Sequence, residues 1–157
     1  MKISLNNIFT LLSESVGLVP TSTLIEECKK LGMEEQPYSD FGIDSNLPEF
    51  DNGYRFICLT DDNQKAFFEV LDKNSKILQA GFQVIYKSDF FGKKYKRHCF
   101  HLFSLLENQY GEGMPMDTPL GETVNYGNEK NICYISMVKA KGRNVVTLRV
   151  GNREFWD

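Results

Sequence analysis

Apolar residues at the start of the chain recur at intervals of three and four, as one face of an amphipathic helix requires. They are Leu5, Ile8, Phe9, Leu12 and Val16. Gly17 is of the residue type that most often ends a helix. Pro20 and the hydroxyl residues after it predict the capped start of a second helix, which ends at Gly32. The sequence therefore predicts two short helices, over residues 5–16 and 20–31.

After residue 53 the pattern changes to the alternation that is typical of strands. The expected strands are 54–60, 66–71, 77–87, 122–126, 131–139 and 144–151, although 66–71 would also fit a short helix. In the strand at 131–139 one face would carry Ile132, Tyr134, Ser136 and Val138. Between the third and fourth strands, residues 93–110 carry a full apolar stripe at helical spacing, and Gly111 ends it. Residues 154–157 could extend the last strand.

Two segments between these elements, 33–53 and 111–121, are rich in turn-forming residues and are expected to be loops. The predicted order is α-α-β-β-β-α-β-β-β, which indicates an α+β fold with an N-terminal helix pair and antiparallel sheet. We expect one domain over residues 1–157, with 1–90 and 91–157 as possible sub-units.

Residues 17–32 run from a glycine through small polar residues into an amphipathic helix and end in Leu31-Gly32. This stretch resembles the opening of bacterial modules that combine helices with an antiparallel sheet, the β-lactamase inhibitor protein group and the small outer-membrane assembly lipoproteins. The resemblance implies a module that binds other proteins and catalyses nothing. The chain lacks the cysteine that follows a signal peptide in the lipoproteins, so an envelope location does not follow.

The N-terminus has no apolar run like a secretory signal, and no stretch is long enough to span a membrane. A cytoplasmic protein is therefore expected. The cysteines are Cys28, Cys58, Cys99 and Cys133. They are far apart in the sequence and lie in apolar settings, so we expect free buried thiols rather than a metal site or disulfides.

Charge is unevenly distributed along the chain. Residues 1–62 hold 4 basic and 11 acidic side chains, a balance of −7, and the remaining 14 and 10 give +4, which together make the net −3. The acidic part would repel nucleic acid and attract a basic partner. The simpler interpretation is a solvated acidic loop that aids solubility.

Aromatic residues are interleaved with these acidic ones, as at the interfaces of protein complexes. They would either anchor a partner or pin the loop to the core. The predicted partner-binding residues are Glu34, Glu35, Tyr38, Asp40, Phe41, Asp44, Glu49, Asp51, Asp61 and Asp62. A basic cluster of Lys87, Lys93, Lys94, Lys96 and Arg97 fits the charged first turn of a helix, and no nucleic-acid signature accompanies it.

Catalytic and metal motifs are weak in this sequence. The only histidines, His98 and His101, flank Cys99 and Phe100 on one helix and are expected at its surface, because both lie off the apolar stripe. No phosphate-binding loop, nucleophile elbow or zinc motif occurs, so we expect no cofactor, no metal and no catalytic residue.

These observations favour a bacterial immunity-type protein that neutralises a basic toxin through an acidic surface. Two alternatives stay open. The chain could be a structural component of a phage or secretion system that uses its sheet edges. It could also be a small-ligand binder or an enzyme whose site forms only in three dimensions.

Overall fold

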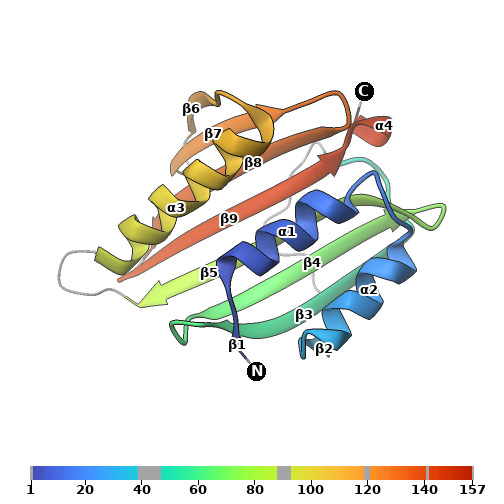
Figure 1. The fold of residues 1–157 in the computed structure, drawn as a ribbon, viewed down its shortest axis with the longest axis horizontal. Helices are drawn as coiled ribbons and strands as arrows, with labels where there is room; N and C mark the ends of the chain where they lie inside the picture. Colours follow the sequence, from blue (N-terminus) through green and yellow to red (C-terminus); the bar gives the residue numbers. More distant parts are fainter. Residues whose placement is uncertain (1, 39–46, 88–92, 119–120, 141, 157) are drawn as a thin grey trace.

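In the computed structural model (Figure 1), three long helices pack on one face of a large sheet. The structure describes residues 2–38, 47–87, 93–118, 121–140 and 142–156. The helices are α1 (Leu5–Ser15), α2 (Thr21–Lys30) and α3 (Lys93–Tyr110), and a short helix, α4 (Arg153–Trp156), follows the last strand. The α+β class predicted from the sequence is confirmed.

The sheet contains nine strands among the described residues, in the order β1-β3-β4-β5-β9-β8-β7-β6, with β2 also paired to β3. The strands are β1 (Lys2–Ile3), β2 (Glu34–Gln36), β3 (Asn52–Thr60), β4 (Lys65–Lys73), β5 (Lys76–Lys87), β6 (Met114–Thr118), β7 (Gly121–Gly127), β8 (Asn131–Ala140) and β9 (Arg143–Asn152). All pairs are antiparallel except β1 with β3. The first and last parts of the chain meet where β5 pairs with β9.

The predicted order of elements was wrong at four places. β1 precedes the first helix, β2 and β6 lie inside the predicted loops 33–53 and 111–121, and α4 replaces the expected extension of the last strand. β1 and β2 are too short to show the alternation of apolar and polar residues that is typical of strands, and both form by pairing with β3. Pro115 weakens the strand signal of β6. Asn152 accepts a hydrogen bond from the N–H of Glu154 through Oδ1 and so starts α4.

The ends of the helices follow the sequence more closely. Gly17 and Gly111 follow α1 and α3 with φ of 79° and 84°, the left-handed region that glycine adopts without strain. The expected hydroxyl cap of α2 is absent. Pro20 is the N-cap without a side-chain hydrogen bond, and the hydroxyl of Thr21 is buried without a partner.

The core lies between the helices and the covered face of the sheet. One row of paired residues crosses five strands and is almost fully buried: Phe56, Phe68, Phe82, Leu148 and Ile135. Ile8 and Leu12 of α1 and Leu102 and Leu106 of α3 join the same cluster. Burial of these side chains at roughly 1.5–3 kcal/mol each holds helices and sheet together.

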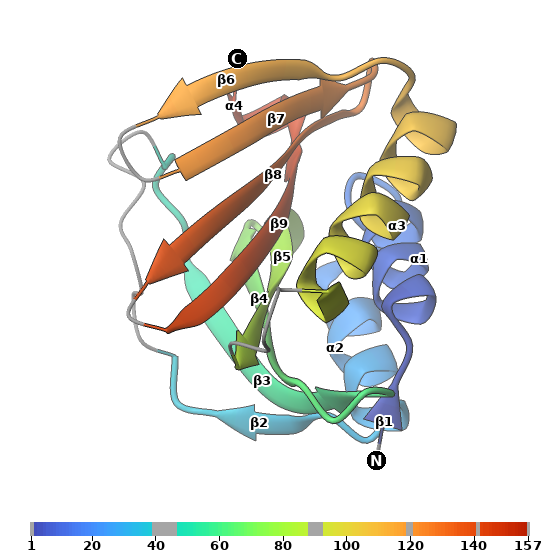
Figure 2. The same cartoon turned by 90° about the vertical axis from the view of Figure 1, so that its left-hand side faces the viewer.

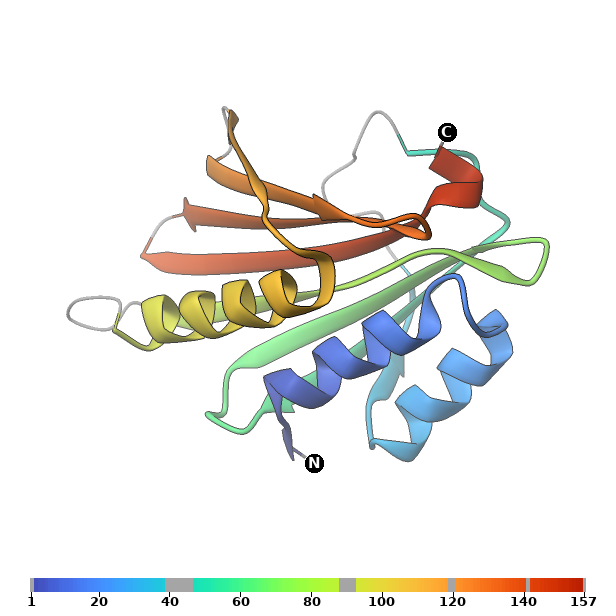
Figure 3. The same cartoon turned by 45° about the horizontal axis from the view of Figure 1, so that its top comes forward.

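The opposite face of the sheet carries none of the three long helices (Figure 2). The two ends of the sheet, β2–β3 and β6–β7, bend away from the helices, so this face is concave (Figures 2 and 3). We call it the open face. Side chains alternate between the two faces of a strand, so the neighbours of each core residue point into the open face.

Glycines in the open face make room for larger side chains that lie across the sheet. A Cβ on Gly53 would be 2.7 Å from the ring of Tyr38, and one on Gly151 would be 2.6 Å from Nε1 of Trp156. One on Gly81 would be 2.5 Å from the carbonyl oxygen of Leu148. The chain is thus packed closely against the sheet at one end of this face.

Candidate functional site

The predicted acidic residues lie along the margin formed by β2 and β3. Glu34 and Glu35 are on β2, Glu49 and Asp51 precede β3, and Asp61 and Asp62 follow it. Asp40, Phe41 and Asp44 lie outside the described residues. Since a strand rises about 3.3 Å per residue, Asp51 and Asp61 are about 30 Å apart. The fold therefore distributes these charges along one edge and does not gather them at a point.

Three of these acidic residues also have partners within the protein. Glu35 lies 3.7 Å from Nζ of Lys29, and Oδ2 of Asp51 accepts a 2.8 Å hydrogen bond from the N–H of Asn74. Asp62 contacts α3, as described below. We call this edge, along which Glu34, Glu49 and Asp61 are exposed to solvent, the acidic margin.

Tyr38 contacts the sheet at the end of the acidic margin. Its ring lies against Gly53 and meets Phe50 edge to face, with the ring centroids 6.0 Å apart. Both aromatic side chains are half-buried. They hold the segment before β3 against the open face.

The open face changes in character from one end of the strands to the other. One row is mainly apolar and contains Leu59, Lys65, Ile85, Val145 and Val138. The next is amide- and hydroxyl-rich and contains Ile57, Phe67, Gln83, Thr147, Ser136 and Thr123. A third carries charge and contains Arg55, Glu69, Gly81, Arg149, Tyr134 and Asn125. Most of these side chains are half-buried by their neighbours and reach the surface.

Arginine and aromatic side chains pair on this face. The guanidinium of Arg149 donates a 2.8 Å hydrogen bond to the hydroxyl of Tyr134. Phe67 has Cζ of Arg55 at 4.1 Å and Nζ of Lys65 at 5.1 Å from its ring centroid. These contacts order long side chains in advance, which lowers the entropy lost when a partner binds. Tyrosine and arginine are also the residue types most enriched in the energetic centres of protein interfaces.

One hollow near the centre of this face is small. It is lined by Phe67, Glu69, Gln83, Thr147 and Arg149 among others and has a volume of about 20 Å³. That is room for about one water molecule. This hollow is therefore too small to enclose a small ligand.

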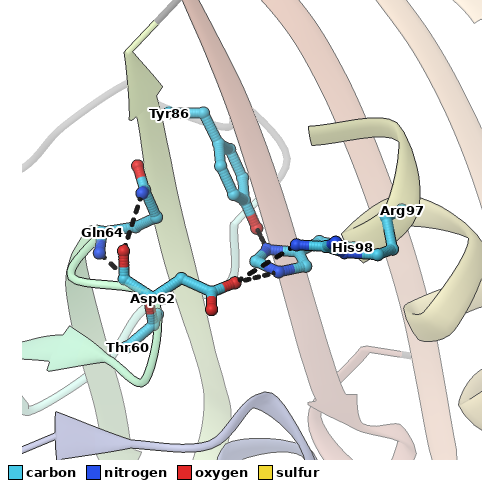
Figure 4. A network of polar contacts seen from close by, with 6 residues as sticks. All are labelled: Thr60, Asp62, Gln64, Tyr86, Arg97 and His98. Carbon is cyan, nitrogen blue, oxygen red and sulfur yellow. Dashed lines mark hydrogen bonds and ion pairs between the residues drawn. The ribbon is translucent and has the colours of Figure 1, made fainter. Parts of the chain in front are cut away.

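A second polar arrangement links the β3–β4 turn, β5 and α3 (Figure 4). Oδ2 of Asp62 lies 2.5 Å from Nε2 of His98, and Nδ1 of His98 lies 2.8 Å from the hydroxyl of Tyr86. His98 is 9 % exposed and Tyr86 is 1 % exposed. The surface position predicted for His98 was therefore wrong, whereas His101 is exposed as expected.

Burial lowers the pKa of His98, and Asp62 opposes this effect while Arg97 and Lys94 add to it. With a neutral imidazole every group is satisfied: Nε2–H donates to Asp62 and the hydroxyl of Tyr86 donates to Nδ1. Burial also raises the pKa of Tyr86, so this hydroxyl keeps its proton. Asp62, His98 and Tyr86 thus form a chain of hydrogen bonds in which every donor meets an acceptor. The chain joins the β3–β4 turn, α3 and β5.

The turn that carries Asp62 is itself held in place. Thr60 accepts a 3.0 Å hydrogen bond from the N–H of Gln64, and the side chain of Gln64 donates to the carbonyl of Asp62 at 3.0 Å. Asn63 adopts φ 61° at the tip. On the other side, the N–H of Asp61 donates to the carbonyl of Ile3 in β1 at 3.2 Å. The turn thus presents Asp62 to α3 in a fixed position.

Beside this chain lies a cleft of about 420 Å³ between the start of α1, the β3–β4 turn and α3. Its lining includes Asn6, Asp61, Arg97, His98 and His101. Nε2 of His101 is hydrogen-bonded to Oδ1 of Asn6 across the cleft. Both nitrogens of His98 are already used, so it has none left to take a proton from a ligand. The geometry offers polar recognition here, and His98 itself has no free nitrogen for acid–base chemistry.

All four cysteines are free and buried, as predicted. Burial raises the pKa of Cys28 to about 12 and those of Cys58 and Cys99 to about 11. Thiols with such pKa values are poor nucleophiles and metal ligands. Within the ranges that the structure describes, no three metal-binding side chains come together, and no helix is long and apolar enough to cross a membrane.

The open face was only partly visible in the sequence. The alternation over 131–139 placed Ile132, Tyr134, Ser136 and Val138 on one side of a strand, and this is the open side. The partners of these residues on β9 and β7 depend on the order of strands, which periodicity does not give.

Comparison of the chain with protein-family models, with curated protein sequences and with solved structures gives no match. The resemblance of residues 17–32 to bacterial inhibitor and assembly modules therefore stays a prediction.

Proposed function

We propose that the protein is a binding protein of the immunity type, which neutralises a basic protein partner in the bacterial cytoplasm. In this proposal the open face makes the contact and the acidic margin along β2 and β3 steers the partner toward it. The observation that supports it most is the concave sheet face that α1, α2 and α3 leave uncovered, on which Arg149 pairs with Tyr134 and Arg55 stacks on Phe67.

The charges near this face fit such a role. Glu34 lies on β2 beside Ile57, next to the open face, and Glu49 and Asp61 are exposed near the two ends of β3. A polar rim around a centre that contains aromatic and arginine side chains is the usual anatomy of a protein interface. Rim charges of one sign increase the rate of association with a partner of the opposite sign.

Assembly through the sheet edges receives less support. The outer side of β3 is paired with β1 and β2. β6, at the other end of the sheet, contains Pro115, and proline is tolerated in a strand where its nitrogen faces away from the ladder. The missing N–H therefore falls on the outward side of β6, which disfavours the addition of another strand.

The test is capture of the partner from the host with the purified chain, followed by binding measurements on the identified protein. Ser136→Arg places a bulky side chain in the middle of the open face, and Thr10→Arg makes the same change on the exposed face of α1. The proposal predicts that Ser136→Arg abolishes binding and that Thr10→Arg does not. Equal binding by both variants would rule out the open face.

A charge test separates the acidic margin from the open face. Glu34→Lys and Glu49→Lys should each slow association several-fold at low salt and have less effect at high salt. Glu26→Lys and Glu107→Lys reverse exposed charges on α2 and α3 and serve as matched controls. If Glu34→Lys and Glu49→Lys leave the association rate unchanged, the acidic margin does not steer the partner.

A further inference from the structure

Two methionine side chains are exposed at the β6 end of the open face. Met114 is 69 % exposed and Met116 is 48 % exposed. The strand register pairs Met114 with Asn125 and Met116 with Thr123, and both of these β7 residues belong to rows of the open face. Residues that are paired directly point to the same side of a sheet. The two methionines therefore extend the open face onto its outermost strand.

The exposed apolar side chains gather on this face. Single exposed apolar residues are common, but three of the five exposed large hydrophobic side chains among the described residues lie here: Leu59, Met114 and Met116. The described side chains that β7 and β6 contribute to the face are Thr123, Asn125 and the two methionines, and none of them is charged. This end of the face therefore suits an apolar part of a partner, whereas the acidic margin at the other end suits a basic part.

The other methionines that the structure describes are shielded from solvent. Met33 is 5 % exposed. Met137 is half-buried on β8 and packs against the core on the helix side of the sheet. Because an oxidant in solution reaches exposed side chains first, Met114 and Met116 are the methionines that it would modify in the folded protein.

From these observations we infer that Met114 and Met116 form a reversible oxidation site that controls binding at the open face. The inference rests on the function proposed above. In the reduced state, the flexible thioether chains adapt to an apolar side chain of the basic partner. In the oxidised state, each sulfoxide is polar and must lose its bound water before the partner can cover it, so the complex is weakened.

The oxidant is a peroxide. A lone pair of the sulfur attacks one peroxide oxygen, the O–O bond breaks, and that oxygen stays on the sulfur while its proton leaves with the other oxygen as water. The sulfur loses two electrons and the peroxide gains them. A methionine sulfoxide reductase reverses the change with a thiol as reductant, which becomes a disulfide.

The two sulfurs differ in their surroundings. The side-chain amide of Asn125 donates a hydrogen bond to Sδ of Met116. This bond occupies one of the lone pairs that would attack the peroxide, and Met116 is also the less exposed of the two. Met114 should therefore be oxidised first.

The first test uses the whole folded protein and hydrogen peroxide, with peptide mass spectrometry to follow each methionine. Met114 should be oxidised fastest and Met116 next, whereas Met33 and Met137 should react much more slowly because they are shielded. Circular dichroism checks that the fold is unchanged. If Met33 or Met137 is oxidised as fast as Met114 in the folded protein, the assignment of the site is wrong.

The second test measures affinity for the protein that the wild-type chain captures from the host and Ser136→Arg does not. Peroxide treatment should weaken this binding about tenfold or more, as the loss of an important contact does, and the reductase should restore it. The double variant Met114→Gln with Met116→Gln imitates the polarity of the sulfoxides and should bind as weakly. The double variant Met114→Leu with Met116→Leu should bind like the wild type before and after peroxide treatment. Leu18→Gln alters an exposed apolar residue elsewhere and should have no effect.

The outcomes separate this inference from the proposed function. Unchanged binding by the glutamine double variant would overturn the oxidation site and leave the open face as the binding surface. Loss of binding by the leucine double variant after peroxide treatment would place the sensitive group elsewhere and would also overturn it. If no host protein distinguishes the wild type from Ser136→Arg, the proposed function fails and the oxidation site fails with it.

Discussion

Asp62 and His98 are joined by a 2.5 Å contact between Oδ2 and Nε2, although one lies in the β3–β4 turn and the other on α3. Tyr86 completes the chain from β5 with a 2.8 Å hydrogen bond to Nδ1 of His98. The three side chains connect the N-terminal strands to the helix that opens the second half of the protein. They set the position of α3, and with it the walls of the neighbouring cleft.

Tyr86→Phe should destabilise the protein by about 1–3 kcal/mol, because Nδ1 of His98 would be buried without its hydrogen-bond donor. Urea denaturation followed by circular dichroism measures this loss. Tyr54→Phe removes a hydroxyl from a half-buried ring and is the control. Equal stability of the wild type and Tyr86→Phe would mean that the hydrogen bond to His98 contributes nothing.

Stability should fall as the pH drops below about 6.5. Burial lowers the pKa of His98 in the folded protein, whereas in the unfolded chain this side chain takes up its proton near the ordinary value of about 6.5. The unfolded chain therefore binds more protons below that pH, and the free energy of unfolding decreases until folded His98 is also protonated.

Denaturation at a series of pH values tests this dependence. His98→Gln should remove most of the decrease between about pH 6.5 and the lower folded pKa. His101→Gln, on the exposed side of the same helix, should retain it. If the decrease in the free energy of unfolding disappeared in His101→Gln and persisted in His98→Gln, its source would be His101 and not His98.

The sequence predicts the elements that a long local pattern defines. It does not predict those that depend on contacts between distant parts of the chain. The helical stripe over 93–110 coincides with α3, and the alternation over 131–139 and 144–151 falls within β8 and β9, because these patterns are local and long. β1 and β2 are recognisable only through their pairing with β3.

The burial of His98 shows the same limit. Its place off the apolar stripe of α3 indicated a surface position, and helical spacing alone would put it there. Asp62 and Tyr86 bury and satisfy it from distant parts of the chain. Polar residues that are buried in this way cannot be separated from exposed ones until the order of the strands is known.

Gly81→Ala should destabilise the sheet by about 1–3 kcal/mol, because the new Cβ would be forced against a neighbouring strand. That atom would be 2.5 Å from the carbonyl oxygen of Leu148, and the backbone of β9 cannot move aside without disturbing its pairs. At Gly151 the nearest atoms all belong to the side chain of Trp156, which can rotate away. Thermal unfolding should therefore show a larger loss for Gly81→Ala than for Gly151→Ala.

The four thiols should be unreactive in the folded protein. Only the thiolate reacts, and burial raises the pKa of Cys28 to about 12 and those of Cys58 and Cys99 to about 11, with Cys133 raised as well. Ellman's reagent at neutral pH should modify no cysteine until denaturant is added, and then all four. Rapid modification of a single cysteine in the native protein would show local opening at that position.

The most direct test of the central claim is site-specific photo-crosslinking in the host cell. A photoreactive phenylalanine analogue at Ser136 lies in the open face, and the same analogue at Thr10 lies on the outer side of α1. We predict that Ser136 captures one protein with a basic surface and that Thr10 does not capture it. If that protein is captured from Thr10 alone, or if Ser136 yields no adduct where the protein is expressed and folded, the open face is not the binding surface.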